Sequence, residues 1–198
     1  MIRDGRLARK FFQRDTLTVA RELLGHHLVR VFEGQPLVGR IVETEAYVGR
    51  GDQACHASRG RTRRTEVMFG PPGHAYVYFI YGMHHCMNIV TEPDGCAAAV
   101  LIRAVEPLEG LEQMRSLRSN RPDRQLTNGP GKLCQAMGIT REQNGLDMIT
   151  SDLLYVEAGQ TLADEQLATS PRINVSGDAF AETTPWRFFV RGNPYVSR

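Results

Sequence analysis

Two carboxylates and a tyrosine alternate along the sequence VETEAYVG, which predicts a strand. Successive side chains of a strand point to opposite faces, so Glu43, Glu45 and Tyr47 share one face. Residues i and i+2 have Cα atoms about 6.6 Å apart, which could bring the two carboxyl groups within the range of a glycosidase pair. In an apolar site the two charges need a cation, and Arg40 and Arg103 are the nearest candidates. The alternative interpretation is a solvated sheet face.

Three tyrosines fall within six residues in the sequence YVYFIYG. Tyr81 stands beside Gly82 at the tip of a predicted hairpin, and Tyr76 and Tyr78 precede it on one strand. Aromatic rings next to a carboxylate can hold a nucleic-acid base outside its stack, and an aromatic tip can wedge between base pairs from the minor groove. The alternative is a strand of core aromatics, which explains an exposed Tyr-Gly tip less well.

Arginine dominates the basic residues, since Lys10 and Lys132 are the only lysines among 24 basic side chains. The net charge is only +2, but the sequence SRGRTRR concentrates four guanidinium groups, at Arg59, Arg61, Arg63 and Arg64. Guanidinium groups bind phosphates in a bidentate manner and stack on bases, so a local patch can bind DNA although the whole chain is nearly neutral. The alternative is a solvated loop.

The composition is typical of a soluble globular protein, with 41% apolar and 23% charged residues in 198. No segment approaches the roughly 20 apolar residues of a membrane span, and no apolar signal core follows the first residues, so we expect a cytoplasmic protein, associated with the nucleoid through DNA. A monomer is the default expectation. The four cysteines lack a CxxC pair and predict buried thiols without a metal site; they are Cys55, Cys86, Cys96 and Cys134.

The pattern of apolar residues predicts a single α+β domain, with a curved and mostly antiparallel β-sheet flanked by helices. A helix with a possible Asp15 or Thr16 cap is expected over 15–25, and another opened by Pro107. A third short helix is expected within 127–139. The predicted strands cover 26–32 and 37–48 around a turn at 33–36, then 75–81, 83–91, 97–105, 153–158 and 186–192. Residues 49–66 predict a polar loop, and 159–185 a polar connector.

Several longer motifs follow one another in order: GRIVETEAYVG, DxxCHAS, MFGPPGHAYVYFIYGMHHCMNIV, VLIRAVEPLEG, NGPGKLCQAMGI and FFVRGNPYVS. Together they resemble the alkyladenine (3-methyladenine) DNA glycosylase family in its short bacterial form. Two departures stand out. RTRR replaces a form closer to RTPR, which affects the DNA contacts expected of Arg63, and the connector 159–185 matches no motif.

The resemblance implies a general base at Glu45, which deprotonates a water that attacks C1′ of a flipped nucleotide. Arg103 is expected to hold that water or Glu45 in place. Tyr47 is expected to stack on the damaged base, where an electron-rich ring favours a cationic alkylated purine. Glu43 then supports the pocket as an ion-paired group.

The remaining pocket and DNA contacts also follow from the resemblance. His56 contacts the other edge of the base, Tyr78 forms the opposing aromatic wall, and Asn88 crowds the exocyclic amine of a normal guanine. Tyr81 fills the gap left in the duplex, with Met83 beside it in the minor groove. The four clustered arginines are expected to bind DNA.

The function that these expectations favour is a monofunctional DNA glycosylase of base excision repair, acting on duplex DNA with damaged purines and needing no cofactor. The purines expected are 3-methyladenine, 7-methylguanine, hypoxanthine and etheno-adenine. One alternative is a glycoside hydrolase that uses Glu43 and Glu45, and another is a damage-sensing DNA-binding module without catalysis. Lys132 could form a Schiff base in a strand-cutting enzyme, although the resemblance favours a phosphate contact. The adjacent His84 and His85 are expected to split between surface and core.

Overall fold

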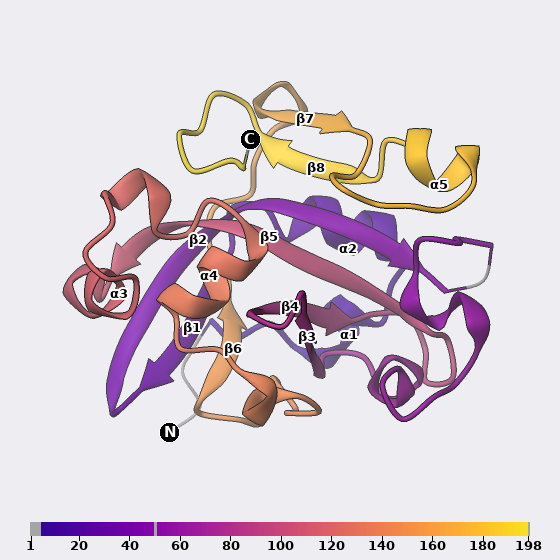
Figure 1. The fold of residues 1–198 in the computed structure, drawn as a ribbon, viewed down its shortest axis with the longest axis horizontal. Coiled ribbons are helices and arrows are strands. Elements are labelled where there is room, and N and C mark those ends of the chain that lie inside the picture. Colours follow the sequence, from indigo (N-terminus) through magenta and orange to yellow (C-terminus); the bar gives the residue numbers. More distant parts are fainter. Residues whose placement is uncertain (1–4, 50, 198) are drawn as a thin grey trace.

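The computed structural model describes residues 5–49 and 51–197, and its centre is an eight-stranded antiparallel sheet. The long strand β2 (Gln35–Val48) pairs along one edge with β5 (Ala98–Glu109). Its other edge is shared by β1 (His27–Phe32) and β8 (Arg187–Val190). Figure 1 shows β2 and β5 crossing the molecule as neighbours. The other strands are β3 (Ala75–Ile80), β4 (His84–Val90), β6 (Leu154–Glu157) and β7 (Leu167–Ser170).

One sheet face is covered by helices, as the interaction between α2 and β2 illustrates. Asp15 begins α2 because its carboxylate accepts a hydrogen bond from the Thr18 N–H at 2.9 Å. The Thr44 hydroxyl of β2 donates to the Ala20 carbonyl at 2.7 Å. This contact puts α2 on the face of β2 opposite the two glutamates. The helices are α1 (Arg9–Phe12), α2 (Thr16–Glu22), α3 (Leu111–Leu117), α4 (Pro130–Ala136) and α5 (Ala179–Thr183).

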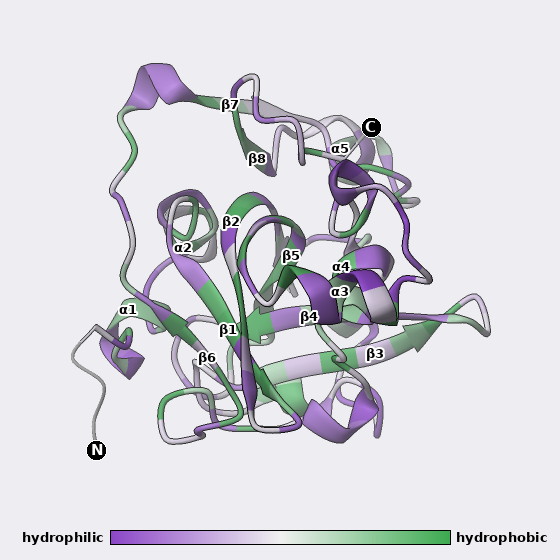
Figure 2. Cartoon of the chain, turned by 90° about the vertical axis from the view of Figure 1, so that its left-hand side faces the viewer, coloured by the Kyte–Doolittle hydropathy of each residue, from purple (hydrophilic) through white to green (hydrophobic). Residues whose placement is uncertain are grey.

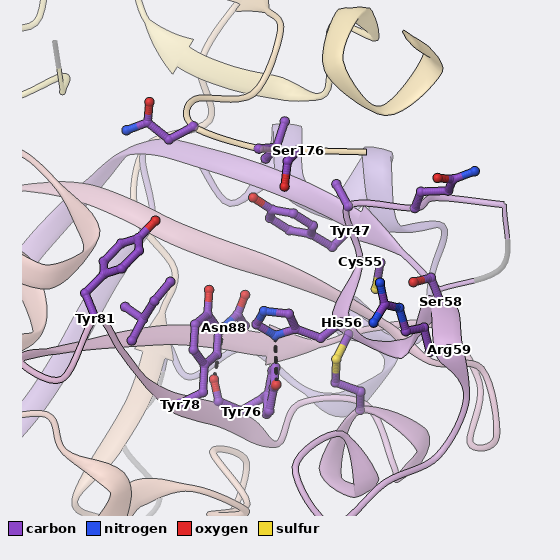
Figure 3. Close-up of a pocket in the computed structure, with 16 residues that line it drawn as sticks. Tyr47, Cys55, His56, Ser58, Arg59, Tyr76, Tyr78, Tyr81, Asn88 and Ser176 are labelled. Carbon is purple, nitrogen blue, oxygen red and sulfur yellow. Dashed lines mark hydrogen bonds between the residues drawn. The ribbon is translucent and has the colours of Figure 1, made fainter. Parts of the chain in front are cut away.

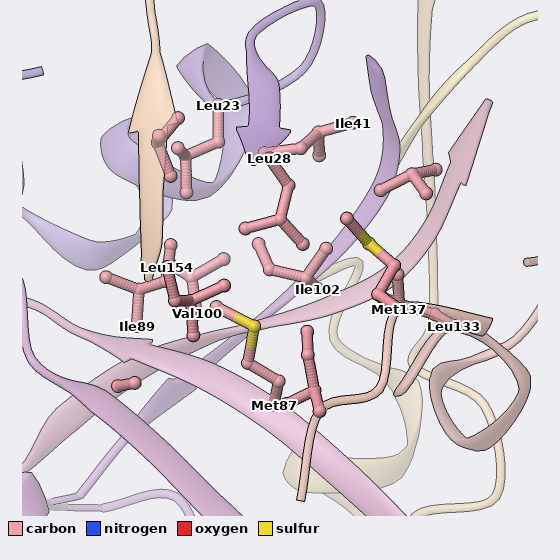
Figure 4. Close-up of a cluster of buried hydrophobic side chains, with 14 of the residues drawn as sticks. Leu23, Leu28, Ile41, Met87, Ile89, Val100, Ile102, Leu133, Met137 and Leu154 are labelled. Atoms are coloured by element: carbon pink, nitrogen blue, oxygen red, sulfur yellow. The ribbon is translucent and has the colours of Figure 1, made fainter. Parts of the chain in front are cut away.

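The hydrophobic core lies on that helix-covered face (Figure 4). Leu23, which follows α2, and Leu133 of α4 join it together with Val100 and Ile102 of β5, all fully buried. Burying one such side chain contributes about 1.5–3 kcal/mol. Because side chains alternate along β5, Arg103 points to the opposite face, where the site is built. The core therefore fixes the strands that carry the polar residues.

Two predicted boundaries near these strands are wrong. The turn expected at 33–36 has only two central residues, Glu33 and Gly34, with φ of +49° and +80°. Two positive φ values suit a tight hairpin turn, so β2 begins already at Gln35. Pro107 does not open a helix, because β5 continues through it, and the proline lies opposite Gly39 where the strand register shifts.

The polar connector and loop are also more ordered than predicted. Residues 159–185 contain β7 and α5, and residues 49–66 contain a 3₁₀ turn at His56–Arg59. Cys96 is exposed and not buried, whereas the other three thiols are buried and free. In the part of the chain that the structure describes, no helix is long and apolar enough to cross a membrane.

The β3–β4 hairpin projects from the body of the molecule (Figure 2). Its tip adopts positive φ at Tyr81 (+54°) and Gly82 (+66°), a conformation that glycine tolerates without strain. Tyr81 is 75% exposed and Met83 is 68% exposed. An exposed aromatic and a methionine at a hairpin tip match the expectation from the sequence.

Candidate active site

The two glutamates of β2 share one arginine on the site face of the sheet. Glu43 and Glu45 are both fully buried. Arg103 lies between them, with Nε donating to Glu43 Oε1 at 3.0 Å and Nη1 lying 3.1 Å from Glu45 Oε2. The predicted cation is therefore Arg103, and a solvated sheet face is excluded. Arg40, the other candidate, instead pairs with Glu106.

Both oxygens of the Glu45 carboxylate are occupied by donors. The Tyr47 hydroxyl donates to Oε2 at 2.8 Å, and the backbone N–H of Ile173 donates to Oε1 at 2.7 Å. Burial, followed by the nearby Glu45 charge, raises the pKa of Tyr47 well above its usual value. The phenol therefore stays protonated and acts as a donor. These contacts fix the orientation of the carboxylate and connect it to a segment 128 residues away.

A cavity of about 430 Å³ opens beside Tyr47, a size within the range of small-molecule sites. Figure 3 shows Tyr47 on one side of it and Tyr78 with His56 on the other. Its lining includes Tyr47, His56, Tyr76, Tyr78, Tyr81 and Asn88. Glu45 and Arg103 do not line it, and the Glu45 carboxylate lies behind the Tyr47 hydroxyl. The cavity can accept a flat aromatic group between opposing rings.

His56 is a neutral group in this wall. Burial, and then the charge of Arg64, lowers the pKa of His56 to about 4. Arg64 can only donate, so its 3.4 Å contact with Nε2 makes that nitrogen the acceptor. Nδ1 then carries the proton and donates to the Tyr76 hydroxyl at 3.0 Å. The ring meets Tyr78 edge to face, with centroids 4.5 Å apart.

Asn88 forms part of the cavity from strand β4. Its side chain is 4% exposed, and its Nδ2 donates to the Tyr76 carbonyl at 3.1 Å. Tyr81 lines the cavity as well, so the exposed hairpin tip stands at its rim. The β3–β4 hairpin thus brings Asn88, Tyr78 and Tyr81 to one cavity.

An ion pair that the sequence analysis missed lies behind Tyr47. Arg172 binds both oxygens of Asp52 at 2.7 Å, and neither side chain is exposed. The guanidinium also lies over the rings of Tyr47 and Trp186, 4.7 Å and 5.1 Å from their centroids. Arg172 immediately precedes Ile173, so the pair anchors the segment that reaches Glu45. Asp52 stands in the DxxCHAS motif, but its partner lies in the connector that matched no motif.

Three of the four clustered arginines line the cavity or a neighbouring groove. Arg59 lines the cavity, and Arg61 lies over the Phe69 ring. Arg63 and Arg64 line the groove together with Arg141, which sequence reasoning did not single out.

The other candidate residues lie elsewhere. Lys132 does not line the cavity, and its Nζ donates to Asn128 at 2.9 Å. The histidine pair does not split between surface and core as expected, because His84 is exposed and His85 is only half-buried, against the exposed ring of Phe79.

Comparison with known proteins identifies relatives over nearly the whole chain. Residues 10–194 match the family model described as Methylpurine-DNA glycosylase (MPG). A protein of Methanocella arvoryzae is 53% identical over 97% of this chain and 96% of its own length. A protein of Carboxydothermus hydrogenoformans is 48% identical over 97% of this chain and 98% of its own. Both bear the name "Putative 3-methyladenine DNA glycosylase".

Proposed function

Because this chain belongs to the methylpurine-DNA glycosylase family, we propose that it removes damaged purines from duplex DNA. It hydrolyses the N-glycosidic bond with water and leaves an abasic site. The observation that carries the proposal is the buried Glu45 carboxylate, hydrogen-bonded to the tyrosine that forms one wall of an aromatic cavity. A carboxylate and a stacking platform can thus act on one flipped nucleotide.

Glu45 acts as the general base in this proposal. It takes a proton from a water that attacks C1′ of the nucleotide in the cavity, next to the Tyr47 hydroxyl that donates to Glu45. Arg103 and the Ile173 N–H hold the carboxylate in a fixed orientation. An alkylated purine leaves readily because it is already cationic, so activating the water is the main task of the protein.

The cavity selects the base in this proposal. Tyr47 stacks on one face, and Tyr78 and His56 close the other side. Electron-rich rings attract a cationic base by up to about 2 kcal/mol when it is desolvated. Asn88 stands where the exocyclic amine of a normal guanine would be crowded. Tyr81 and Met83 occupy the gap left in the duplex, and the surrounding arginines bind phosphates.

Replacing Glu45 with Gln tests the role of the base. The assay follows base release from a duplex with a single hypoxanthine or etheno-adenine, in EDTA, and from methylated DNA. The substitution keeps the shape and removes the proton acceptor, so release should fall by about 10²–10⁴-fold. Binding to a duplex containing a tetrahydrofuran abasic-site analogue should stay within about twofold and serves as the control for folding.

Strand scission is scored in the same samples with and without alkali. Breaks that appear only after alkali support hydrolysis by water. Breaks without alkali point to an amine nucleophile and would move attention to Lys132. If the wild type binds damaged duplexes and releases no base from any of them, the damage-sensing module becomes the better description.

A further inference from the structure

Ser197, in the segment that follows β8, is hydrogen-bonded to the glutamate next to the proposed base. The residue is 8% exposed. Its backbone N–H donates to Glu43 Oε2 and its hydroxyl donates to Glu43 Oε1, both at 2.7 Å. A single serine thus satisfies both oxygens of a fully buried carboxylate.

The same serine contacts the two arginines that neutralise Glu43. Its hydroxyl oxygen accepts from Arg103 Nη2 at 3.3 Å, and its carbonyl oxygen accepts from Arg187 Nη2 at 3.1 Å. Arg187 Nε in turn donates to Glu43 Oε1 at 2.6 Å. Ser197 therefore completes a network of three side chains around Glu43, together with Arg103 and Arg187.

We propose that Ser197 is a positioning residue that keeps Arg103 on Glu45. Arg103 lies between two carboxylates and can favour either of them. While Ser197 and Arg187 satisfy Glu43, the Nη1 of Arg103 remains available to Glu45. Without the serine hydroxyl, Arg103 Nη2 loses its acceptor and Glu43 Oε1 loses one of its three donors. The guanidinium is then less constrained and shifts toward Glu43, away from Glu45. This inference rests on the function proposed above for Glu45.

A change in pH dependence distinguishes positioning from mere stabilisation. The charged and titratable groups around Glu45 are Tyr47, Cys86, Arg103, Glu43 and Arg172. A carboxylate that loses its cationic neighbour keeps its proton to higher pH. Since the base acts only when ionised, the acidic limb of the pH–rate profile should move to higher pH when Ser197 loses its hydroxyl.

The experiment compares single-turnover base release by the wild type, Ser197→Ala and Ser197→Thr. Ser197→Ala should slow release at neutral pH by about tenfold, the size expected when one hydrogen bond to a charged group is removed. Ser197→Thr keeps the hydroxyl and should restore most of the rate. The matched control is Ser170→Ala, because the Ser170 hydroxyl also accepts from Arg187, at 3.0 Å, but touches neither Glu43 nor Arg103. It should change the rate by less than about twofold.

The outcomes separate this inference from the proposed function. If the wild type releases no base, the proposed function fails first. If the wild type releases base and Ser197→Ala does so with the same rate and pH profile, positioning by Ser197 is wrong. It is equally wrong if Ser197→Ala loses activity uniformly at every pH and Ser197→Thr does not restore it. Should Ser197→Ala fail to fold, Ser197→Cys takes its place, because a thiol is a weaker donor than a hydroxyl. Its acidic limb should then move to higher pH relative to the wild type, by less than complete loss of the donor would cause.

Discussion

At the scale of single residues, His56 is built to remain uncharged. Arg64 donates to one ring nitrogen, and the other nitrogen donates to Tyr76. Burial and the Arg64 charge together lower the pKa of His56 to about 4, from an ordinary 6.5. A neutral imidazole can pack against a base edge without repelling a cationic purine. An acid–base role for His56 at neutral pH is therefore not supported by its surroundings.

The depressed pKa of His56 predicts how stability depends on pH. Between pH 6.5 and about 4 the unfolded chain binds a proton at this histidine and the folded protein does not. Stability should therefore fall as the pH is lowered through this window. Stability is measured by urea unfolding at several pH values from neutral pH down through this window. His56→Gln should reduce the slope of the free energy of unfolding against pH, and the control His84→Gln, at an exposed position, should keep that slope. Equal slopes for the wild type and His56→Gln would contradict the prediction.

At the scale of elements, one segment from the end of the chain completes a site built on β2. The Arg172–Asp52 pair anchors residues 171–176 to the loop after β2, and the N–H of Ile173 then reaches Glu45. Arg172 also donates to the Ala46 carbonyl of β2 at 2.9 Å. The segment needs no regular secondary structure, because side-chain contacts from a buried arginine hold it in place.

Asp52→Asn tests this anchor because it leaves the Arg172 charge buried without its anion. Breaking a buried pair from one side should lower the free energy of unfolding by about 3–5 kcal/mol. The matched control is Asp152→Asn, whose carboxylate is 92% exposed beside Arg6. Since ion pairs in water contribute about 0–1 kcal/mol, it should change stability far less. Similar decreases for the two variants, measured by urea unfolding, would show that Asp52 does not anchor the segment.

Elements that are fixed by local chemistry could be predicted from the sequence, whereas contacts between distant segments could not. The helix at Asp15, the β3–β4 hairpin and the shared face of Glu43 and Glu45 follow from local chemistry, and all are present. The extent of β5 through Pro107 depends on a register shift in its partner, which no local pattern reveals. Arg172 and Ser197 are also out of reach, because their partners lie 120 and 154 residues away in sequence.

At the scale of the whole molecule, ion pairs neutralise many arginines but, among the described residues, none of the cluster beside the cavity. Many arginines are paired with carboxylates, among them Arg14 with Glu22 and Arg21 with Asp164. Within residues 5–49 and 51–197, no ion pair is formed by the four clustered arginines or by Arg141 of the neighbouring groove; the cluster is Arg59, Arg61, Arg63 and Arg64. A chain with a net charge of +2 can therefore present a concentrated positive surface to DNA.

The salt dependence of binding tests whether this surface binds phosphates. For Arg61→Ala combined with Arg63→Ala, the slope of log Kobs against log salt should become shallower by about 0.9 for each phosphate that the protein no longer neutralises. The control combines Arg14→Ala with Arg21→Ala, which removes the same net charge from ion-paired positions and should keep the wild-type slope. Binding is measured by titrating a duplex with a tetrahydrofuran site at several salt concentrations. Equal slopes for the two double variants would mean that net charge, and not this patch, attracts the DNA.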